Sequence, residues 1–317
     1  MNHCDGMLVM AATTGGHLVQ LHELADRLPH RGPRLWVTFD SDQARTLLCG
    51  ERTAFIPYIA ERDSAGILRA LPYARRILTG NGRISAVVST GSAIALAFLP
   101  YAAAIGIPAH YIESAARVGR PSLTGRLLTA VPRVRLYRQY LHSANGRWAY
   151  GGSVFDGFEP VEVPPRPVRR VVVTLGTMAQ GFRRLLERLT AIIPAGVEVL
   201  WQTGLTPTDG LAIQPRGLVS AADLTAAIRQ ADAVVAHAGC GSALTALKAG
   251  KCPVLVPRNP GKNEVIDAHQ AELAAWLSAK RLAFSRKAET LAFSDLQRAS
   301  EREILRAPAL PSFRLGA

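Results

Sequence analysis

The residues best suited to chemistry form a glycine-rich turn, His237–Ser242, between an apolar strand and a helix. The strand is predicted over Ala233–Ala236 and the helix over Ala243–Ala249. Glycine lets the main chain come close to a ligand, and a helix N-terminus presents N–H groups and the positive end of a dipole. The turn is therefore suited to an anion such as a diphosphate, with contacts expected at His237, Gly239, Gly241 and Ser242.

A turn of this kind often only connects a strand to a helix, so its surroundings matter. The turn Gly176-Thr177 follows another apolar strand, predicted over Arg170–Leu175, and Asp267-Ala268-His269-Gln270 lies downstream. Ligands of parallel α/β sheets bind beyond the carboxyl ends of the strands. The added polar residues favour a ligand site over a plain connector.

A histidine follows the first predicted strand, Met7–Ala12, in the turn Gly15-Gly16-His17. Imidazole titrates near neutral pH, so this side chain can accept a proton from a hydroxyl group. Glu113 stands at the end of another apolar strand, where a carboxylate can act as a base or orient a hydroxyl. Both roles stay open, because His17 can instead make a structural hydrogen bond at a helix start and Glu113 a salt bridge to an arginine.

Strand and helix signals alternate along both halves of the chain, which predicts an α/β fold with two doubly wound parallel sheets. The proline-rich segment Glu159–Val168 is predicted to be an extended linker. It divides an N-terminal domain (residues 1–160) from a C-terminal domain (residues 161–317), with a cleft expected between them. The segment Leu291–Arg306 is predicted to be a helix.

The composition indicates globular domains: of 317 residues, 48% are hydrophobic and 19% are charged. The four cysteines have neither paired nor metal-site spacing, which argues against a disulfide scaffold and predicts a reducing compartment. The N-terminal apolar run is short and has no charged region before it, so we expect no secretory signal. The expected location is the cytoplasm.

The formal net charge is +13, and one basic stretch contributes much of it. Between Glu113 and Asp156 no acidic residue occurs, and the arginines there are Arg117, Arg120, Arg126, Arg133, Arg135, Arg138 and Arg147. A field of one sign attracts polyanions, so Arg117 and Arg126 are expected beside an anionic acceptor or a membrane surface. Nucleic acid fits less well, because no repeated aromatic pattern accompanies the arginines. The alternative is a solvated basic face without a partner.

One uncharged apolar stretch, Ala93–Ile112, has the length of a membrane span. Pro100, Gly106 and Pro108 interrupt it, so a helix, a turn and a buried strand are predicted instead. Peripheral attachment remains open, because an apolar surface next to arginines suits interfacial binding.

The second half resembles nucleotide-sugar glycosyltransferases of the GT-B fold, closest to family 28 and its two-component relatives. In that family HAG-x-G-[ST] holds the donor diphosphate and D-x-HQ lies by the donor sugar, which here match His237–Ser242 and Asp267–Gln270. The resemblance implies that Asp267, His269 and Gln270 contact the sugar. Two positions depart from the family pattern: Thr245 replaces a glutamate tied to the ribose, and Val265 replaces a histidine.

The first half resembles the acceptor-side component of the split transferases of bacterial exopolysaccharide and asparagine-linked glycosylation. The matching segments are Tyr111–Val118, Pro121–Leu128 and Tyr150–Phe155, similar to ES-x-ARV, SLTG-[RK]-LL and YGG-x-[VF]-F. The Gly15-Gly16-His17 turn resembles the first loop of family 28, whose histidine has been suggested as a base. The chain therefore resembles both components fused, acceptor half first.

These resemblances imply an inverting glycosyltransferase that moves a sugar from a UDP-sugar to a lipid-diphosphate-linked sugar in cell-surface polysaccharide or glycan assembly. His17 or Glu113 would take the acceptor proton, and Gly239–Ser242 with Gly176 and Thr177 would stabilise the departing diphosphate. We expect no cofactor and no obligatory metal, because no DxD pair stands at a strand end. Expected partners are the UDP-sugar, the sugar acceptor and the anionic inner face of the plasma membrane, which the protein would bind peripherally.

Three alternatives remain from the sequence. A UDP-sugar epimerase shares the fold and would use carboxylates such as Glu264 and Asp267. A glycosyltransferase acting on a soluble acceptor would need no membrane. A non-catalytic basic module would bind membrane or RNA and no UDP.

Overall fold

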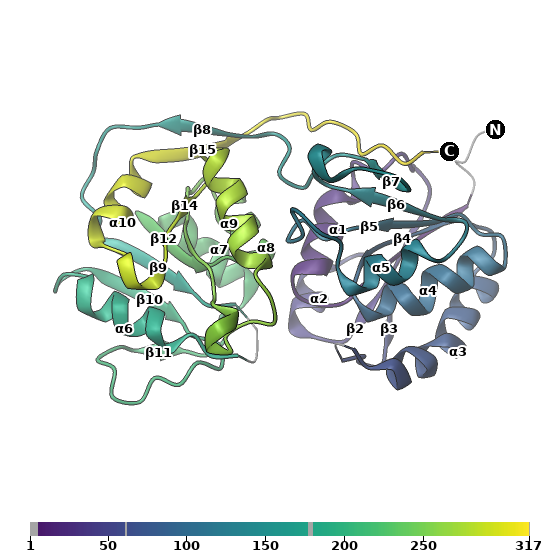
Figure 1. The fold of residues 1–317 in the computed structure, drawn as a ribbon, viewed down its shortest axis with the longest axis horizontal. Coiled ribbons are helices and arrows are strands. Elements are labelled where there is room, and N and C mark those ends of the chain that lie inside the picture. Colours follow the sequence, from purple (N-terminus) through teal and green to yellow (C-terminus); the bar gives the residue numbers. More distant parts are fainter. Residues whose placement is uncertain (1–5, 61, 177–179, 317) are drawn as a thin grey trace. The chain divides into compact units, whose positions relative to one another are not determined.

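The computed structural model describes residues 6–60, 62–176 and 180–316. The chain folds as two compact units. The first runs to Asp156 and includes the residues from Leu310 onward, and the second is Gly157–Ala309. Each unit contains one parallel sheet with helices packed against it, as the sequence predicted (Figure 1).

The sheet of the first unit has seven parallel strands in the order β3-β2-β1-β4-β5-β6-β7. The strands are β1 (Met7–Ala12), β2 (Arg34–Phe39), β3 (Thr53–Ile56), β4 (Ile84–Gly91), β5 (Ala109–Ile112), β6 (Val134–Arg138) and β7 (Trp148–Tyr150). Every residue of β1 is buried, because a central parallel strand is covered on both faces. The strand order reverses between β1 and β4, and such a switch point is where sheets of this type bind ligands.

The helices of the first unit are α1 (Gly16–Ala25), α2 (Asp42–Leu47), α3 (Ser64–Gly80), α4 (Ala93–Ala104) and α5 (Leu123–Thr129), with a 3-10 turn η1 (Leu141–Ser143). Side chains of Ser41, Asp63 and Ser122 cap α2, α3 and α5 by accepting a first-turn N–H. Helix α1 instead follows Gly15, which has no side chain to cap it.

The uncharged stretch Ala93–Ile112 forms α4, a turn and β5, as predicted. Most of α4 is buried in the core of the first unit, where Phe98 and Leu99 have no exposed surface. Its apolar sequence is therefore explained by packing. Within the described ranges, no helix combines the length and apolar character that a membrane crossing requires.

The second unit repeats this plan with a six-stranded parallel sheet in the order β11-β10-β9-β12-β13-β14. Its strands are β9 (Arg170–Thr174), β10 (Glu198–Gln202), β11 (Pro215–Arg216), β12 (Ala233–His237), β13 (Val254–Val256) and β14 (Phe284–Ser285). Its helices are α6 (Arg183–Ile192), α7 (Ala221–Gln230), α8 (Cys240–Lys248), α9 (His269–Ala279) and α10 (Phe293–Ser300), with 3-10 turns η2 (Pro260–Lys262) and η3 (Ala288–Thr290). Here the strand order reverses between β9 and β12.

Two predictions for the second unit were wrong in part. The segment Glu159–Val168, predicted to be a linker, contributes to β8 (Phe158–Glu162), and Leu291–Arg306, predicted to be one helix, forms α10 and then β15 (Arg302–Arg306). β8 and β15 pair antiparallel, with Ile304 opposite Pro160. Proline occurs in edge strands where its missing N–H is not needed, so the prolines did not exclude a strand.

The last residues of the chain pack on the first unit, anchored by Arg27 and Phe313. The Arg27 guanidinium donates to the Pro311 carbonyl at 2.9 Å and pairs with Asp156 at 2.8 Å. The Phe313 side chain is 1% exposed, and its ring lies where a Cβ added at Gly151 would come within 2.4 Å of it. Gly151, in the motif Tyr150–Phe155, therefore has a packing role within this chain.

We expect the substitutions Gly151→Ala and Phe313→Ala to be strongly non-additive. Phe313→Ala alone should destabilise the first unit by about 3–5 kcal/mol, the usual cost of truncating a buried phenylalanine. Gly151→Ala alone should also destabilise, because the new methyl group meets the ring. In the double variant the ring is absent, so the alanine should cost much less. Urea unfolding of the four proteins measures this coupling, and additive losses would contradict it.

Candidate functional site

In the first unit, His17 stands at the switch point between β1 and β4. Its Nδ1–H donates to the Thr90 carbonyl oxygen at 2.7 Å, and the Thr90 hydroxyl donates to the His17 carbonyl oxygen at 2.8 Å. The half-buried imidazole is thus tied to β4 by its Nδ1. Because Nδ1 carries the proton in this arrangement, the lone pair of the neutral ring is on Nε2, the tautomer that a general base needs.

Glycines make room for this histidine. Gly91, with φ of 109°, ends β4, and a Cβ there would lie 3.1 Å from His17 Cε1 and 3.2 Å from the Tyr111 hydroxyl. Gly15 has φ of 85°, and its N–H donates to Gln43 Oε1 at 2.6 Å. Gly16 is the first residue of α1.

Glu113 follows β5 and is 1% exposed. Its Oε1 accepts from the Tyr111 hydroxyl at 3.1 Å and from the Ser114 N–H at 3.0 Å. Its Oε2 accepts from the Ser122 N–H at 2.9 Å and from the Ser122 hydroxyl at 3.1 Å. A Cβ added at Gly125 would lie 2.3 Å from Oε2. The residues Glu113, Ser122 and Gly125 of the two matching motifs therefore form one hydrogen-bonded unit.

His17 and Glu113 lie near each other. Gly91 lies against both His17 and Tyr111, and the Tyr111 hydroxyl donates to Glu113. Of the two candidates, His17 has the more suitable surroundings for a base. Both Glu113 oxygens already accept hydrogen bonds that hold the loop, so protonation of this carboxylate would weaken them. Burial, with the Glu113 charge second, raises the pKa of the Tyr111 hydroxyl well above its ordinary value.

Two buried glutamines, which the sequence did not single out, join the motifs of the first unit. Gln20 Oε1 accepts from the Ala115 N–H at 2.7 Å, and Gln20 Nε2 donates to the Ser114 hydroxyl at 3.1 Å. Gln139 Nε2 donates to the Glu113 carbonyl oxygen at 2.9 Å, and its Oε1 accepts from the Val154 N–H at 2.8 Å. Gln139 directly follows β6, as Glu113 directly follows β5. This position at the end of a strand is the feature of the sequence by which Gln139 could have been predicted.

The arginine run of the first unit divides into buried and exposed members. Arg138 is 1% exposed, and its guanidinium donates to the Gly119 carbonyl oxygen at 2.7 Å. Arg147 donates to the carbonyl oxygens of Val131 and Val134. Both arginines hold loops, although Arg147 is exposed. Arg126 is exposed on α5, and Arg117 is half-buried after Glu113.

In the second unit, His237 ends β12 and its ring is enclosed by two glycines of the predicted site. A Cβ added at Gly176 would lie 2.3 Å from His237 Cε1, and one at Gly239 would lie 2.3 Å from Nε2. The structure therefore brings Gly176, His237 and Gly239 together at the switch point. Thr177, predicted beside them, lies outside the described residues.

The His237 side chain is held in its neutral form. The residue is 6% exposed, and burial, with the positive charge of Arg258 second, lowers its pKa to about 4. The neighbouring Cys240 is buried too, and burial raises the pKa of its thiol far above the ordinary value. A thiol in that state is not a nucleophile at neutral pH, so Cys240 is a packing residue.

Helix α8 begins after Gly239, with Gly241 and Ser242 half-buried in its first turn. No side chain is available at Gly239 to cap the first-turn N–H groups, which an anion can therefore use. The Thr245 hydroxyl donates to the Gly241 carbonyl oxygen at 2.9 Å. Thr245 thus bonds within its own helix at the position where the family has a ribose-binding glutamate.

The downstream residues Asp267, His269 and Gln270 lie at the start of α9. His269 Nδ1 pairs with Asp267 Oδ1. The positive charge of His269 also contributes to lowering the pKa of His237, so the two histidines are near each other. Gln270 is 1% exposed, and its Oε1 accepts from the Arg258 N–H at 3.1 Å. Part of Gln270 is therefore used to hold the chain after β13.

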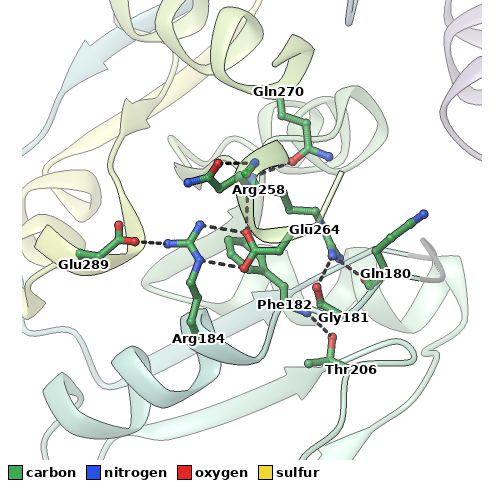
Figure 2. A network of polar contacts seen from close by, with 11 residues as sticks. Gln180, Gly181, Phe182, Arg184, Thr206, Arg258, Glu264, Gln270 and Glu289 are labelled. Carbon is green, nitrogen blue, oxygen red and sulfur yellow. Dashed lines mark hydrogen bonds and ion pairs between the residues drawn. The ribbon is translucent and has the colours of Figure 1, made fainter. Parts of the chain in front are cut away.

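A network of charged residues supports these loops (Figure 2), and of its charged members the sequence analysis named only Glu264, for the epimerase alternative. Glu264 pairs with Arg184 through both oxygens, at 2.7 and 2.9 Å, and also accepts from the Asn259 N–H at 2.8 Å. Arg184 further pairs with Glu289 at 2.7 Å. Both oxygens of Glu264 are engaged, which leaves it poorly suited to the acid/base role that an epimerase would require.

The described residues contain no group of three or more His, Cys, Asp or Glu side chains arranged to hold a metal ion.

Comparison with known proteins finds similarity to glycosyltransferases. Residues 170–301 match the glycosyltransferase family 28 C-terminal domain. The chain is 28% identical over 292 residues to a UDP-N-acetylglucosamine--N-acetylmuramyl-(pentapeptide) pyrophosphoryl-undecaprenol N-acetylglucosamine transferase of Synechococcus sp., covering 85% of this chain and 80% of the relative. A protein of that name from Prochlorococcus marinus is 28% identical over 294 residues, with 86% and 80% covered.

Solved structures agree in fold. The crystal structure of Acinetobacter baumannii MurG matches with a TM-score of 0.57 at 19% identity, covering 92% of this chain and 89% of that one. The Streptomyces nogalater glycosyltransferase SnogD matches with a TM-score of 0.58 at 17% identity, covering 93% and 90%. The solved structures share the GT-B fold, and the family match with the relatives supports a family 28-like glycosyltransferase, an enzyme of the hexosyltransferase class.

Proposed function

We propose that this enzyme transfers a sugar from a UDP-sugar to a lipid-diphosphate-linked sugar, with inversion at the anomeric carbon. The relatives support the substrate classes, because their names specify UDP-N-acetylglucosamine and a pyrophosphoryl-undecaprenol acceptor. The observation that carries the donor half is the start of α8, where uncapped N–H groups follow a histidine kept neutral by burial.

On this proposal the first turn of α8 binds the diphosphate of the donor. The helix dipole and the N–H groups near Gly241 and Ser242 would stabilise the charge that develops as UDP departs. Asp267, His269 and Gln270 would contact the donor sugar. The same electrostatic stabilisation makes a metal dispensable, so we expect turnover to persist in the presence of a chelator.

In the reaction the acceptor hydroxyl oxygen attacks the anomeric carbon of the donor. The bond from that carbon to the diphosphate oxygen breaks, and its electron pair leaves with UDP. The hydroxyl proton passes to Nε2 of His17, whose Nδ1–H is held by Thr90. Glu113 would position the loop that contains Arg117, and Arg117 would bind the anionic part of the acceptor.

The other functions predicted from the sequence fit less well. An epimerase needs available carboxylates at the donor sugar, and Glu264 is bound to Arg184 and Asn259. A non-catalytic module is inconsistent with the glycosyltransferase family match. The acceptor panel described next distinguishes a soluble acceptor from a lipid-linked one. Incubation with UDP-N-acetylglucosamine and a panel of lipid-linked and soluble acceptors tests the proposal, and it fails if only epimerised donor appears.

For location we propose the cytoplasmic face of the plasma membrane, with peripheral attachment through α5. Leu123 and Leu127 on this helix are 46% and 49% exposed, and Arg126 lies between them. Exposed apolar side chains beside a basic one suit an anionic lipid surface. Leu128, on the same helix, has no exposed area and belongs to the core.

Gly241→Val should abolish UDP binding while the protein remains folded. A branched side chain in the first turn of α8 would occupy the space of the diphosphate. Calorimetric titration with UDP measures the loss. Gly80→Val, at the end of α3 where a new Cβ meets nothing within 4 Å, is the matched control. Normal UDP affinity in Gly241→Val would show that the diphosphate binds elsewhere.

His17→Ala should lower turnover about a hundredfold or more if His17 is the general base, with UDP affinity almost unchanged. His22→Ala, on the same helix but with its ring 5.8 Å from the Trp36 ring, is the control and should retain near-normal turnover. Glu113→Gln should instead lower the melting temperature, because an amide nitrogen cannot accept the hydrogen bonds that hold the loop. Full activity of His17→Ala would move the base to another group.

Replacing Leu123 and Leu127 by serine and Arg126 by glutamate should release the protein from anionic vesicles. A basic residue near such a surface contributes about 1 kcal/mol, and added salt weakens the attraction. Arg135→Glu is the control. Val134 and Leu136 of β6 pack in the same core as Leu128 of α5, whereas Arg135 lies between them in the strand and donates to the Gly316 carbonyl oxygen. Its charge is therefore not part of the proposed α5 surface. Vesicle co-sedimentation at low and high salt measures binding. Wild-type protein that stays in solution at low salt would exclude the membrane role.

A further inference from the structure

Arg258 is a buried arginine whose position no sequence motif explained. It follows β13 after Pro257 and is 2% exposed. Its guanidinium carbon lies 5.2 Å from the centre of the Phe182 ring, and Arg184 lies at the same distance from that ring. Burying a charge is costly unless hydrogen bonds replace its lost hydration. The contacts of this guanidinium therefore indicate what the charge is used for.

The guanidinium binds both ends of the loop that follows β9. Nη2 donates to the Leu175 carbonyl oxygen at 3.1 Å, before the loop. Nη1 donates to the carbonyl oxygens of Gln180 and Gly181, after it, the latter at 2.9 Å (Figure 2). The main-chain N–H of Arg258 donates to Gln270 Oε1. One residue thus connects the loop after β9, the end of β13 and the start of α9.

The hydrogen-bond partners of the guanidinium are all neutral. Glu264, the acid whose charge acts on it, is itself bound by Arg184 and the Asn259 N–H. Burial lowers the pKa of Arg258 to about 10, which still leaves the group charged at neutral pH. Its charge also helps to keep His237 neutral. Filling this space alone does not require a charge, since buried charges can often be replaced by well-packed apolar side chains at little cost in stability.

We propose that Arg258 is a positioning residue for the nucleotide donor: its guanidinium holds the chain at Leu175, Gln180 and Gly181, and its main-chain N–H holds the Gln270 side chain, in the arrangement to which the donor binds. This inference rests on the proposed function. Arg258 acts through the main chain of the loop next to Gly176 and His237. A planar guanidinium reaches carbonyl groups on both sides of the loop, whereas a lysine ammonium is a single point.

The experiment compares Arg258→Lys and Arg258→Met with Arg188→Lys as the matched control. Arg188 is on α6 and donates one hydrogen bond, to the Leu291 carbonyl oxygen, away from the loop. Circular dichroism and urea unfolding establish which variants are folded. Calorimetry with UDP and steady-state kinetics with UDP-N-acetylglucosamine and a lipid-linked acceptor follow.

We expect both Arg258 variants to bind UDP at least tenfold more weakly and to raise the donor KM, with the acceptor KM unchanged. Arg188→Lys should match the wild type. A purely structural role would lower kcat in proportion to the folded fraction and leave the donor KM unchanged, and that result would overturn the inference. It would also be overturned if both Arg258 variants lost their folded structure, since Arg258 would then be a folding residue.

Failure of the proposed function gives a different result. Wild-type protein that binds no UDP would remove the proposed function and this inference with it. Wild-type protein that binds UDP, together with Arg258 variants of unchanged affinity and donor KM, would overturn the inference alone.

Discussion

Main-chain N–H and C=O groups of a buried loop must find hydrogen-bond partners within the protein, and this requirement shapes the carboxyl edge of both sheets. In the first unit Glu113 accepts N–H groups and Arg138 donates to carbonyl oxygens of the same loop. In the second unit Arg258 donates to carbonyl oxygens on both sides of the loop after β9. Charged groups make stronger hydrogen bonds than neutral ones, so a few side chains suffice. These hydrogen bonds hold Leu175, Gln180 and Gly181 in the second unit and the residues beside Glu113 in the first.

Several motif glycines are explained by the side chains beside them. Gly125 leaves room for the Glu113 carboxylate, and Gly176 and Gly239 leave room for the His237 ring. Gly91 does the same for His17, and its positive φ adds a second reason for glycine. The glycine spacing thus reports internal packing as well as ligand approach. At Gly239 the packing role coincides with the proposed ligand-binding role, because the residue accommodates His237 and also precedes α8 without a capping side chain.

The alternation of strands and helices was predictable because buried parallel strands are apolar runs bounded by turns, as in β1 and β12. The ribbon of β8 and β15 was not, since its strands are far apart in the chain and β8 contains Pro160. Site residues at strand ends, such as His17 and Glu113, could be found from position. Their hydrogen-bond partners Ser122 and Thr90 could not be found in this way, because only the fold brings them close. Thr90 also contributes a main-chain carbonyl, which every residue type possesses. Arg258 had the positional signal, but nothing in the sequence showed that its charge would be buried.

The buried arginines also change how the net charge of +13 is understood. Arg27, Arg138 and Arg258 are each at most 6% exposed, and all three donate to main-chain carbonyl oxygens. Their guanidinium groups hold loops and chain ends, so they are not available for direct contact with a lipid surface. A membrane contact must therefore be argued from exposed groups. On α5 the exposed Arg126 and the exposed leucines occur together, and only such a combination supplies both the electrostatic and the apolar part of interfacial binding.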